Sequence, residues 1–468
     1  MTEFSSDTMH LPPSSVSALL HRLSREPGFL EFNEPAVVAS TPTGQKSGLR
    51  KSGLKKVSAW PVTIWQLPET PAEMAHLTRE IEGRFRELAV PDRKMAAGGV
   101  GGLLDYESGR ATVPGLRDAR ARLCSGQIGL YLWEINLGSD SEPGADIRFH
   151  PQCPDSLRAK VLAFVSEGVY ASNAPADSLA WDGVRITRPF QPLTTDEQYR
   201  QGVRDIVAAI EAGDCYQVNF SRRFTGGFEG QPYAAYQNLI REIPVPFSGF
   251  FNQGDYQVLS VSPELMLAIS RGEVTSKPIK GTRPRSEDPA EDQAYSGALL
   301  NSEKDRAENL MIVDLIRNDL SAFCTPHSVT VPKLFDLESY RNVHQMVSTV
   351  RGRLRTDVSP LAALLTAFPG GSVTGAPKRM AMEMIRDMET SQRGPYCGSL
   401  FWWDFNDNLV SNIAIRTLMT ETDGSIHVWG GCGIVADSDA EEELQESVTK
   451  IQRLMDAVAS SDDSEQTL

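Results

Sequence analysis

Several features that would place this 468-residue protein in a familiar class are scarce or missing. No two of its six cysteines form a C-x-x-C pair; they are Cys124, Cys153, Cys215, Cys324, Cys397 and Cys432. Scattered cysteines in a long chain favour reduced, packed thiols over a disulfide framework or a zinc site. No run approaches the roughly 18 apolar residues of a membrane span, and residues 1–10 lack the basic and apolar regions of a signal peptide. We therefore expect a cytoplasmic protein.

Positive charge is also in short supply. Lys and Arg total 46 against 61 Asp and Glu, which gives a formal net charge of −15. Nucleic acids and anionic membranes bind clustered Lys and Arg, so neither is expected as a partner. If the substrate is an anion, its site must supply positive potential locally, from Arg, Lys, a metal ion or backbone N–H groups. The hydrophobic content of 40% is enough for an ordinary globular core.

Local composition divides the chain into regions. Residues 45–56 (QKSGLRKSGLKK) combine Gly and Ser with positive charge, which is typical of a solvated loop. Residues 173–182 are small and polar and include a proline, which indicates a seam between two regions. We therefore separate an N-terminal region, 1–180, from a larger C-terminal domain, 181–460. The acidic tail at 461–468 is expected to be disordered.

Periodic segments predict both helices and antiparallel strands. Thr195 can cap a helix that carries an apolar stripe and ends at Gly213. Short strand-like runs then follow one another with turns between them, the order expected of antiparallel sheets rather than of βαβ units. Runs of this kind are found at 128–135, 216–221, 248–252, 258–261 and 265–269. Further helices are expected at 70–88, 305–316 and 440–455, so the fold class is α+β.

Two of these helices carry acidic pairs. Asp305 and Glu308 are three residues apart, as are Glu443 and Glu446, so each pair lies on one face of its helix. If the two faces converged, their carboxylates would suit Mg²⁺, a hard cation that prefers oxygen ligands. Either pair alone is explained as well by a solvated acidic face, because most Asp and Glu lie on protein surfaces.

Two glycine-bearing segments and one arginine are candidates for anion binding. The segments GGSVTGAPK (370–378) and GGCGIVADS (430–438) are typical of turns whose backbone N–H groups face an anion, or of glycines required by turn geometry alone. Arg416 lies in a strand-like run, where a buried guanidinium needs a carboxylate from the protein or from a ligand. An edge-strand salt bridge is the alternative.

Lys280 and His344 each allow two interpretations. Lys280 lies in an apolar-flanked turn within the basic segment KPIKGTRPR (277–285). Desolvation and nearby cations lower the pKa of a lysine, which makes its amine nucleophilic at neutral pH, although surface lysines are commoner. His344, in the strand-like run VHQMVSTV, fits a hydrogen-bonded core histidine equally well.

Together these segments resemble the chorismate-utilising enzymes, and within them the aminodeoxychorismate synthase component I branch. The resemblance spans about residues 98–450 and is densest after residue 191. The motifs occur in the family's order: GGVGGLLDYESGR (98–110), GDCYQVNFSRRF (213–224), SPELML (262–267), PIKGTRPR (278–285), KDRAENLMIVDLIRND (304–319), VHQMVSTVRG (343–352), FPGGSVTGAPK (368–378), AIRT (414–417) and GGCGIVADSDAEEELQESVTK (430–450).

The resemblance implies an architecture of two facing antiparallel sheets wrapped by helices. The N-terminal and C-terminal segments would intertwine in a single catalytic body. Residues 1–180 would form the N-terminal region typical of anthranilate synthase component I, and residues 181–460 the chorismate-binding catalytic domain.

The resemblance also implies chorismate, a dicarboxylate, as substrate and Mg²⁺ as cofactor. Glu308 and Glu446 match the direct metal ligands, with Asp305 and Glu443 as outer or water-mediated ones. The positions that match substrate-binding residues are Gly281, Thr282, His344, Thr374, Tyr396, Arg416, Gly431, Gly433 and Lys450.

Two positions separate the branches of this family. Isochorismate and salicylate synthases have a water-activating lysine where this chain has Gln217, and anthranilate synthase usually has alanine where this chain has Lys280. In the lysine-bearing branch, the amine of Lys280 would attack C2 of chorismate while Glu264 protonates the departing C4 hydroxyl, and ammonia would then displace the lysine by attack at C4. The expected product is 4-amino-4-deoxychorismate, on the way to 4-aminobenzoate and folate.

Two other functions remain as alternatives. Anthranilate synthase component I is the alternative enzyme, and it differs in eliminating pyruvate after amination. A non-catalytic chorismate-binding scaffold is disfavoured, because Lys280, Glu264 and all four acids are present.

The source of ammonia points to a partner. Class I glutaminases have a nucleophilic cysteine in a G-x-C-x-G elbow, and no cysteine here has that context. Cys432 comes nearest, in GGCGI, but Ile434 replaces the second glycine. We therefore expect a separate glutaminase subunit.

Overall fold

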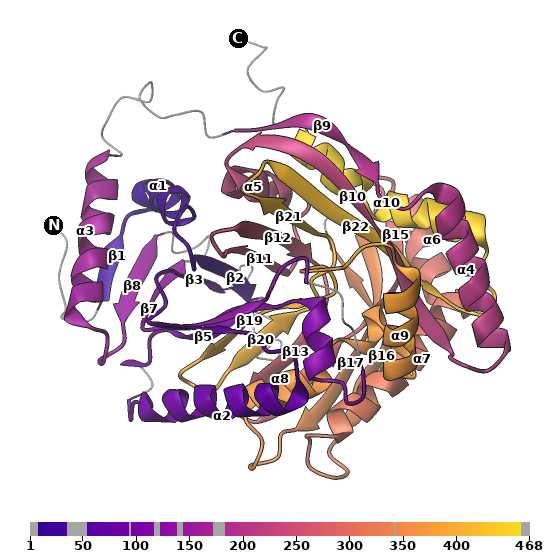
Figure 1. Ribbon diagram of the computed structural model, residues 1–468, viewed down its shortest axis with the longest axis horizontal. Coiled ribbons are helices and arrows are strands. Elements are labelled where there is room, and N and C mark those ends of the chain that lie inside the picture. The colour runs from indigo at the N-terminus through magenta and orange to yellow at the C-terminus, as the bar shows by residue number, and fades with distance from the viewer. Residues whose placement is uncertain are drawn as a thin grey trace.

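A computed structural model describes residues 8–34, 54–92, 95–116, 122–137, 144–171, 183–340 and 343–459. Two large antiparallel sheets face each other, with helices packed around them (Figure 1). The predicted α+β fold, with two facing sheets in one intertwined body, is confirmed. The segments 173–182 and 461–468, predicted as a seam and a tail, lie outside the described residues, as does most of the loop predicted at 45–56, and the boundary at residue 180 stays a prediction.

The larger sheet has 12 strands and contains both the first and the last strand of the described residues. Its order is β1-β8-β7-β3-β2-β11-β12-β21-β22-β10-β18, and β9 also pairs with β10. The strands are β1 (Thr8–Leu11), β2 (Leu30–Glu34), β3 (Leu54–Ser58), β7 (Trp133–Leu137), β8 (Ala145–Phe149), β9 (Val184–Pro192), β10 (Gln217–Gly230), β11 (Phe247–Asn252), β12 (Tyr256–Ser262), β18 (Gly375–Ala376), β21 (Thr417–Glu421) and β22 (Ser425–Ile434).

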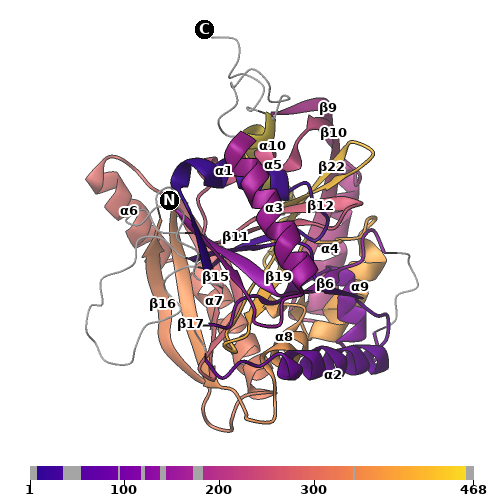
Figure 2. The ribbon, with the colours of Figure 1, turned by 90° about the vertical axis from the view of Figure 1, so that its left-hand side faces the viewer.

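The second sheet has ten strands in the order β15-β17-β14-β13-β20-β19-β5-β6-β4, and β16 also pairs with β17 (Figure 2). They are β4 (Thr63–Gln66), β5 (Gly99–Leu104), β6 (Gln127–Tyr131), β13 (Leu265–Ser270), β14 (Glu273–Lys277), β15 (Ile279–Pro284), β16 (Thr330–Ser339), β17 (Val343–Arg353), β19 (Ser399–Asp404) and β20 (Leu409–Asn412).

Strands from distant parts of the chain alternate in both sheets. In the larger sheet β2 pairs with β11, and in the second sheet β5 lies between β6 and β19. The glycines of β5 permit this close approach, because a Cβ on Gly99 would lie 2.3 Å from the carbonyl oxygen of Trp403. The glycines at 98–102 thus let β5 pack closely between its neighbouring strands.

Ten α-helices and several short 3₁₀ helices surround the sheets in the described residues. They are α1 (Pro13–Leu23), α2 (Pro71–Glu87), α3 (Asp155–Ala171), α4 (Asp196–Glu211), α5 (Pro232–Glu242), α6 (Pro289–Leu300), α7 (Glu303–Ser321), α8 (Pro360–Ala367), α9 (Lys378–Met388) and α10 (Ala440–Ala459), and the 3₁₀ helices η3 (Tyr106–Ala111) and η5 (Gly371–Val373) are used below. Among the helices within these ranges, none is both long and apolar enough to cross a bilayer.

Two helix caps follow from the sequence. Thr195 starts α4 with a capping box, in which its hydroxyl accepts from the backbone of Gln198 and the Gln198 side chain accepts from the backbone of Thr195. Gly213, at a φ of 86°, lies directly after the end of the same helix. Ser302 caps α7 by accepting a hydrogen bond from the backbone of Asp305.

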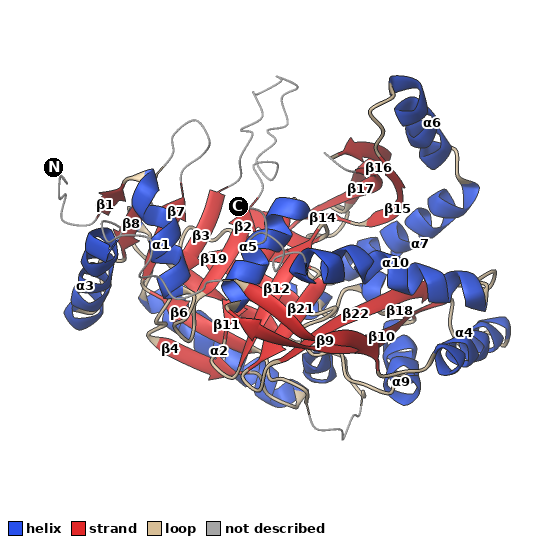
Figure 3. Cartoon of the chain, turned by 90° about the horizontal axis from the view of Figure 1, so that it is seen from above, coloured by secondary structure: helices blue, strands red, loops and turns tan. Residues whose placement is uncertain are grey.

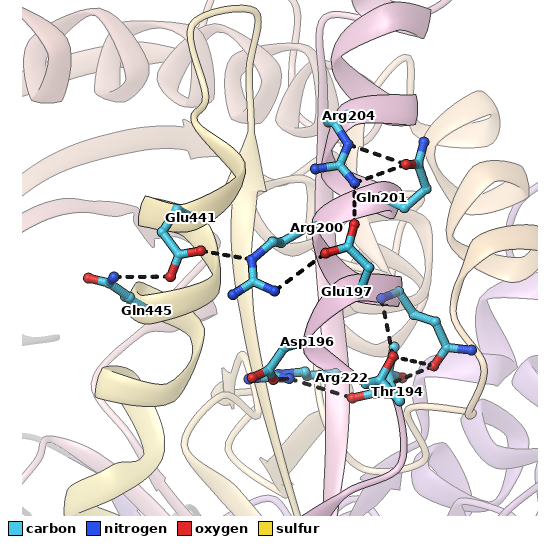
Figure 4. A network of polar contacts seen from close by, with 11 residues as sticks. Thr194, Asp196, Glu197, Arg200, Gln201, Arg204, Arg222, Glu441 and Gln445 are labelled. Carbon is cyan, nitrogen blue, oxygen red and sulfur yellow. Dashed lines mark hydrogen bonds and ion pairs between the residues drawn. The ribbon is translucent and has the colours of Figure 1, made fainter.

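Helix α4 is tied to α10, which carries one of the acidic pairs. Arg200 of α4 donates to Glu441 at the start of α10 over 2.7 Å and lies 3.5 Å from Glu197 of its own helix (Figure 4). Arg222 of β10 donates to Asp196 in the first turn of α4. These bonds help fix the N-terminal turns of α10 relative to β10 and β22.

Four local predictions need correction. The run 128–135 is two strands, because the chain passes from β6 in one sheet to β7 in the other at Leu132. Residues 430–434 belong to β22 rather than to a turn, and Lys280 lies in β15 rather than in a turn. Arg416 lies outside a strand, between β20 and β21, at a φ of 50°. Glycines required by close packing look the same in a sequence as glycines required by turns.

Candidate active site

Lys280 marks the point where the two sheets meet. It lies on β15 of the second sheet, and its Nζ is 3.3 Å from Oε2 of Glu308 on α7. A Cβ placed on Gly433, in β22 of the larger sheet, would lie 3.2 Å from the same Nζ. The Lys280 side chain therefore reaches from one sheet toward the other, and its amine lies between α7 and β22.

Gly281 allows Lys280 to reach this position. Its φ of 77° is unfavourable for other residues, and a Cβ there would lie 2.8 Å from the carboxyl carbon of Asp305. The pairing of β15 with β17 also shifts register between Ile279 and Thr282. A local irregularity in an edge strand thus turns Lys280 toward the interior, while Thr282 is exposed.

Glu264 is a buried acid near Lys280. It follows β12, and its carboxyl accepts a 2.9 Å hydrogen bond from Ser372 of η5. Burial raises its pKa from 4.5 to about 7, against the opposing effects of the Ser372 hydrogen bond and the charge of Lys280. The Glu264 carboxyl can therefore hold a proton at neutral pH, and it lies close enough to Lys280 for the charge of that lysine to lower its pKa.

The two acidic helices face each other across a pair of lysines. Glu446 of α10 is 2.7 Å from Lys450 one turn along, and Glu308 of α7 pairs with Lys280. The pKa of Lys304 is raised. Burial acts to lower it, but the negative charges around it outweigh burial; these belong to Glu308, Glu443, Asp437 and Glu446. Acids from both helices thus lie around one lysine, and Figure 3 locates α7 and α10 in the molecule as seen from above.

The α10 acids differ in their environments. Burial raises the pKa of Glu443, opposed by a 2.7 Å hydrogen bond from Ser438. Burial also acts to raise the pKa of Glu446, but the charges of Lys450, Lys280 and Lys304 outweigh it, and the pKa of Glu446 is lowered. Asp305, the outer acid of α7, pairs with Arg283 at 3.0 Å.

The donor atoms on α10 fit a hard cation in part. Oxygens of Glu443 and Glu446 and the sulfur of Cys432 lie within 4.8 Å of one another. Burial raises the pKa of Cys432 to about 12, so this thiol stays protonated and is a poor ligand. The carboxylates are the ligands that Mg²⁺ prefers, and Glu308 faces them with Lys280 as its present partner.

The glycines of β22 are required by contacts rather than by a turn. A Cβ on Gly430 would lie 2.2 Å from the Ser447 carbonyl oxygen of α10, and one on Gly431 would lie 2.6 Å from the Cβ of Ser221. Lys450 donates to the carbonyl of Gly431 over 3.2 Å. The glycines bring α10 close to the sheet, so that its acids lie at the end of the Lys280 side chain.

Arg416 is a positive group without a protein partner among the described residues. Among the described residues, its half-buried guanidinium forms no hydrogen bond or ion pair. Burial lowers its pKa, and the nearby charge of Arg453 lowers it further. A desolvated guanidinium without a carboxylate in the protein is suited to an anionic ligand. The predicted edge-strand salt bridge is absent from the part of the chain that the structure describes.

Tyr396, His344 and Thr374 are all buried. The Tyr396 ring is parallel to that of Trp429, with centroids 6.1 Å apart. Both nitrogens of His344 are engaged, Nε2 with Asp292 at 2.9 Å and Nδ1 with Ser339 at 2.8 Å. Thr374 donates to the carbonyl of Gly370 over 2.9 Å and so braces the turn that carries Ser372.

The structure thus brings together Lys280, Gly281, Gly433, Glu308 and the α10 residues, and it places Glu264 within electrostatic range of Lys280. Sequence reasoning missed Ser372, Lys304 and Asn219, which contact or face this group. Ser372 and Asn219 lie inside the quoted motifs, and membership of a motif is the signal that could have identified them. Only the fold shows that their side chains lie near Glu264 and Lys280.

Comparisons with known proteins bear on this arrangement. The profile of the chorismate binding enzymes matches residues 49–456. The chain belongs to the chorismate-binding enzyme family. The predicted family resemblance is therefore confirmed, and the match covers every named strand except β1 and β2 as well as all the site residues named above.

Curated relatives narrow the branch. Aminodeoxychorismate synthase component 1 of Salmonella typhimurium is 39% identical over 361 residues, which is 76% of each chain. Its counterpart in Escherichia coli K12 is 37% identical over 363 residues, again 76% of each chain. Anthranilate synthase component 1 of Pseudomonas putida is 38% identical over a shorter stretch of 286 residues, which is 61% of this chain and 58% of that protein.

Solved structures of this family share the fold. Anthranilate synthase component I from Streptococcus pneumoniae superposes with a TM-score of 0.70 at 23% identity, over 97% of this chain and 93% of that one. The menaquinone-specific isochorismate synthase of Escherichia coli gives a TM-score of 0.71 at 16% identity, over 97% and 94%. At these identities the likeness establishes the fold of the family and no specific reaction.

Proposed function

We propose that the protein is an aminodeoxychorismate synthase that acts on chorismate and ammonia to give 4-amino-4-deoxychorismate. The observation that carries this proposal is that Glu264 lies within electrostatic range of Lys280. An amine and a buried, proton-bearing carboxyl lie in one site, with Gln217 at the position where the water-using branches have lysine. The two component 1 relatives described above bear the name of this enzyme.

The chemistry assigned to the two groups balances. The neutral amine of Lys280 forms a bond to C2 of chorismate, the two ring double bonds shift, and the C4–O bond breaks. Glu264 donates the proton with which the C4 hydroxyl leaves as water. Ammonia then forms a bond to C4, the double bonds shift back, and the C2–Nζ bond breaks with its electron pair returning to Lys280. The new ammonium group at C4 returns one proton to the Glu264 carboxylate, which restores both side chains. The sum is chorismate plus ammonia giving aminodeoxychorismate plus water.

Positive groups around the site suit a dicarboxylate. Arg416 is unpaired among the described residues, and Lys450 lies beside the Gly431 carbonyl. We assign both to the substrate's carboxylates, with Gly431, Gly433 and Tyr396 beside them. Gly281, Thr282, His344 and Thr374 are assigned to the pocket wall or to its support. An acidic protein thereby gains local positive potential where an anion must bind.

Mg²⁺ is the cofactor that the acidic residues fit. Glu308 and Glu446 would be its direct ligands, and Asp305 and Glu443 would act through water. A bound ion would supply positive charge that offsets these carboxylates and an anionic substrate. With Glu308 engaged as a ligand, Lys280 would lose its present partner, and its amine would be available to the substrate.

A separate glutaminase subunit is the proposed source of ammonia. Burial raises the pKa of all six cysteine thiols, and to about 12 at Cys432, so none is a ready thiolate nucleophile for glutamine. The relatives named component 1 imply a second component. All six cysteines are free, which supports a reducing compartment, and we propose the cytoplasm.

One assay tests the proposed function. Purified protein is incubated with chorismate, MgCl₂ and ammonium chloride at pH 8, and the products are separated by liquid chromatography and mass spectrometry. We expect aminodeoxychorismate and, in trapped samples, a covalent adduct on Lys280. Anthranilate formed without an added lyase would instead assign the protein to the anthranilate synthases.

Lys280→Ala supplies the matched variant. It should lose the adduct and at least about 100-fold of aminodeoxychorismate formation, because the displacement no longer has its first nucleophile. Lys277, on β14 and paired with Glu338, lies outside the site, and Lys277→Ala should keep both the adduct and the product. Full activity in Lys280→Ala would refute the assigned role.

A further inference from the structure

Two buried amide side chains in this site have polar atoms without a partner among the described residues. Gln217 is 1% exposed and Asn219 is 7% exposed. Within the described ranges, both polar atoms of the Gln217 amide and Oδ1 of Asn219 are buried without a hydrogen bond. A buried polar atom left unpaired is destabilising, so such atoms call for a ligand or another specific reason.

Strand pairing places both amides on the face that Lys280 reaches. Gln217 and Asn219 are two residues apart on β10, so their side chains share one face of the sheet. Asn219 lies directly opposite Gly433 of β22. A Cβ on Gly433 would lie 3.3 Å from Nε2 of Gln217 and 3.2 Å from Nζ of Lys280. The amides and the amine therefore converge on the space above this glycine.

The next residue on the same face shows that the unpaired amides are local. Ser221, two positions beyond Asn219, donates to Glu389 over 2.8 Å and is satisfied. The backbone of Asn219 is also satisfied, since its N–H donates to Thr374 and its carbonyl accepts from Arg393. On the part of this face nearest Lys280, the amides of Gln217 and Asn219 thus have unpaired atoms among the described residues, which suits groups that bind a reactant.

We propose that Asn219 binds the incoming ammonia, with its amide oxygen and that of Gln217 as acceptors. This inference rests on the proposed function and names a residue for its second step. Ammonia offers three N–H donors and one lone pair, and two amide oxygens can hold it while the lone pair stays free for C4. An amide oxygen is not a base at neutral pH, so it favours neutral ammonia, whereas a carboxylate would stabilise the unreactive ammonium ion.

The role assigned to Asn219 has a kinetic signature. The Lys280 adduct forms before ammonia reacts, so loss of an ammonia contact should leave adduct formation intact. Asn219→Ala and Asn219→Leu should raise the KM for ammonia about tenfold, the effect of one lost hydrogen bond, and change the KM for chorismate less than about twofold. Both variants should fold, because the side chain has no protein partner to lose.

Ser372→Ala is the matched control. Ser372 donates to Glu264, which acts in the first step, so this variant should slow adduct formation and leave the KM for ammonia unchanged. Rates of adduct formation are measured by quenched-flow mass spectrometry without ammonia, and the KM for ammonia by product formation across ammonium chloride concentrations at fixed pH and ionic strength.

The outcomes separate the inference from the proposed function. If wild-type protein gives neither the adduct nor the product, the proposed function fails. If wild type behaves as proposed but the Asn219 variants keep the wild-type KM for ammonia, the inference is wrong. A raised KM for chorismate with slowed adduct formation in these variants would assign Asn219 to the substrate and would also refute it.

Discussion

Glu264→Gln should make the protein more stable at pH 8 while it removes the proposed acid. Burial raises the pKa of Glu264 from 4.5 to about 7 in the folded state. Between these values the unfolded chain has released the proton and the folded chain retains it, so folding becomes less favourable as pH rises. Above about pH 7 both states are ionised and the cost is constant. Glutamine is neutral at every pH and avoids it.

The size of the effect follows from the shift. A change of about 2.5 pKa units corresponds to about 3 kcal/mol at pH 8, and to less than about 1 kcal/mol at pH 5. Ser372 can donate to the glutamine oxygen as it does to the carboxyl, so the packing should change little. We therefore expect the variant to gain about 3 kcal/mol at pH 8 and to lose nearly all adduct formation.

The assay is urea-induced unfolding of wild type and variant at pH 5 and pH 8, with adduct formation measured in parallel. Glu107→Gln is the control, because burial raises the pKa of Glu107 to about 7 as well. Its carboxylate accepts hydrogen bonds from the backbone N–H groups of Arg393 and Gly394 and has no assigned part in the reaction. It should show a similar dependence on pH and keep its activity. A stability difference for Glu264→Gln that is equal at the two pH values would refute this reasoning.

Three further predictions concern the reaction itself. Adduct formation should not increase with pH above about pH 7, because loss of the Glu264 proton offsets any gain in the neutral Lys280 amine, and a rate that rises steadily to pH 9 would contradict this. Glu308→Gln and Glu446→Gln should each lower Mg²⁺-dependent turnover at least about 100-fold with an unchanged circular dichroism spectrum. The control is Glu441→Gln, an exposed change on the same helix as Glu446, and its activity should stay near that of wild type. Near-normal activity of both site variants at low millimolar Mg²⁺ would overturn the metal assignment. The isolated chain should use ammonium salts but not glutamine, and equal rates with the two would remove the need for a glutaminase partner.

The sequence supports the architecture and the identity of the site residues, because these depend on long motifs with a fixed order. It also predicts the Thr195 cap and the acidic pairs, which are local features. It does not predict the partners of those acids, since Glu308 with Lys280, and Asp305 with Arg283, are contacts between α7 and β15 that only the fold brings together.

The errors have a common cause. Gly430 and Gly431 were interpreted as turn residues, yet they lie in a strand that α10 approaches closely. Arg416 was placed in a strand, whereas a positive φ separates it from β21. In each case the sequence pattern indicates a special residue type. The structural reason for that residue lies in the packed fold, which the local sequence does not show.

The alternation of early and late strands also governs when the protein can fold during synthesis. Strand β5 completes its pairing only with β19, about 300 residues later, and β10 pairs with β22, some 200 residues after it. At about 5–20 residues per second, the ribosome takes roughly 15 to 60 seconds to close the first gap. Until then β5, whose six residues are all buried in the finished sheet, has one unpaired edge. The nascent N-terminal half should therefore depend on chaperones to avoid aggregation, even though the finished chain buries these edges completely.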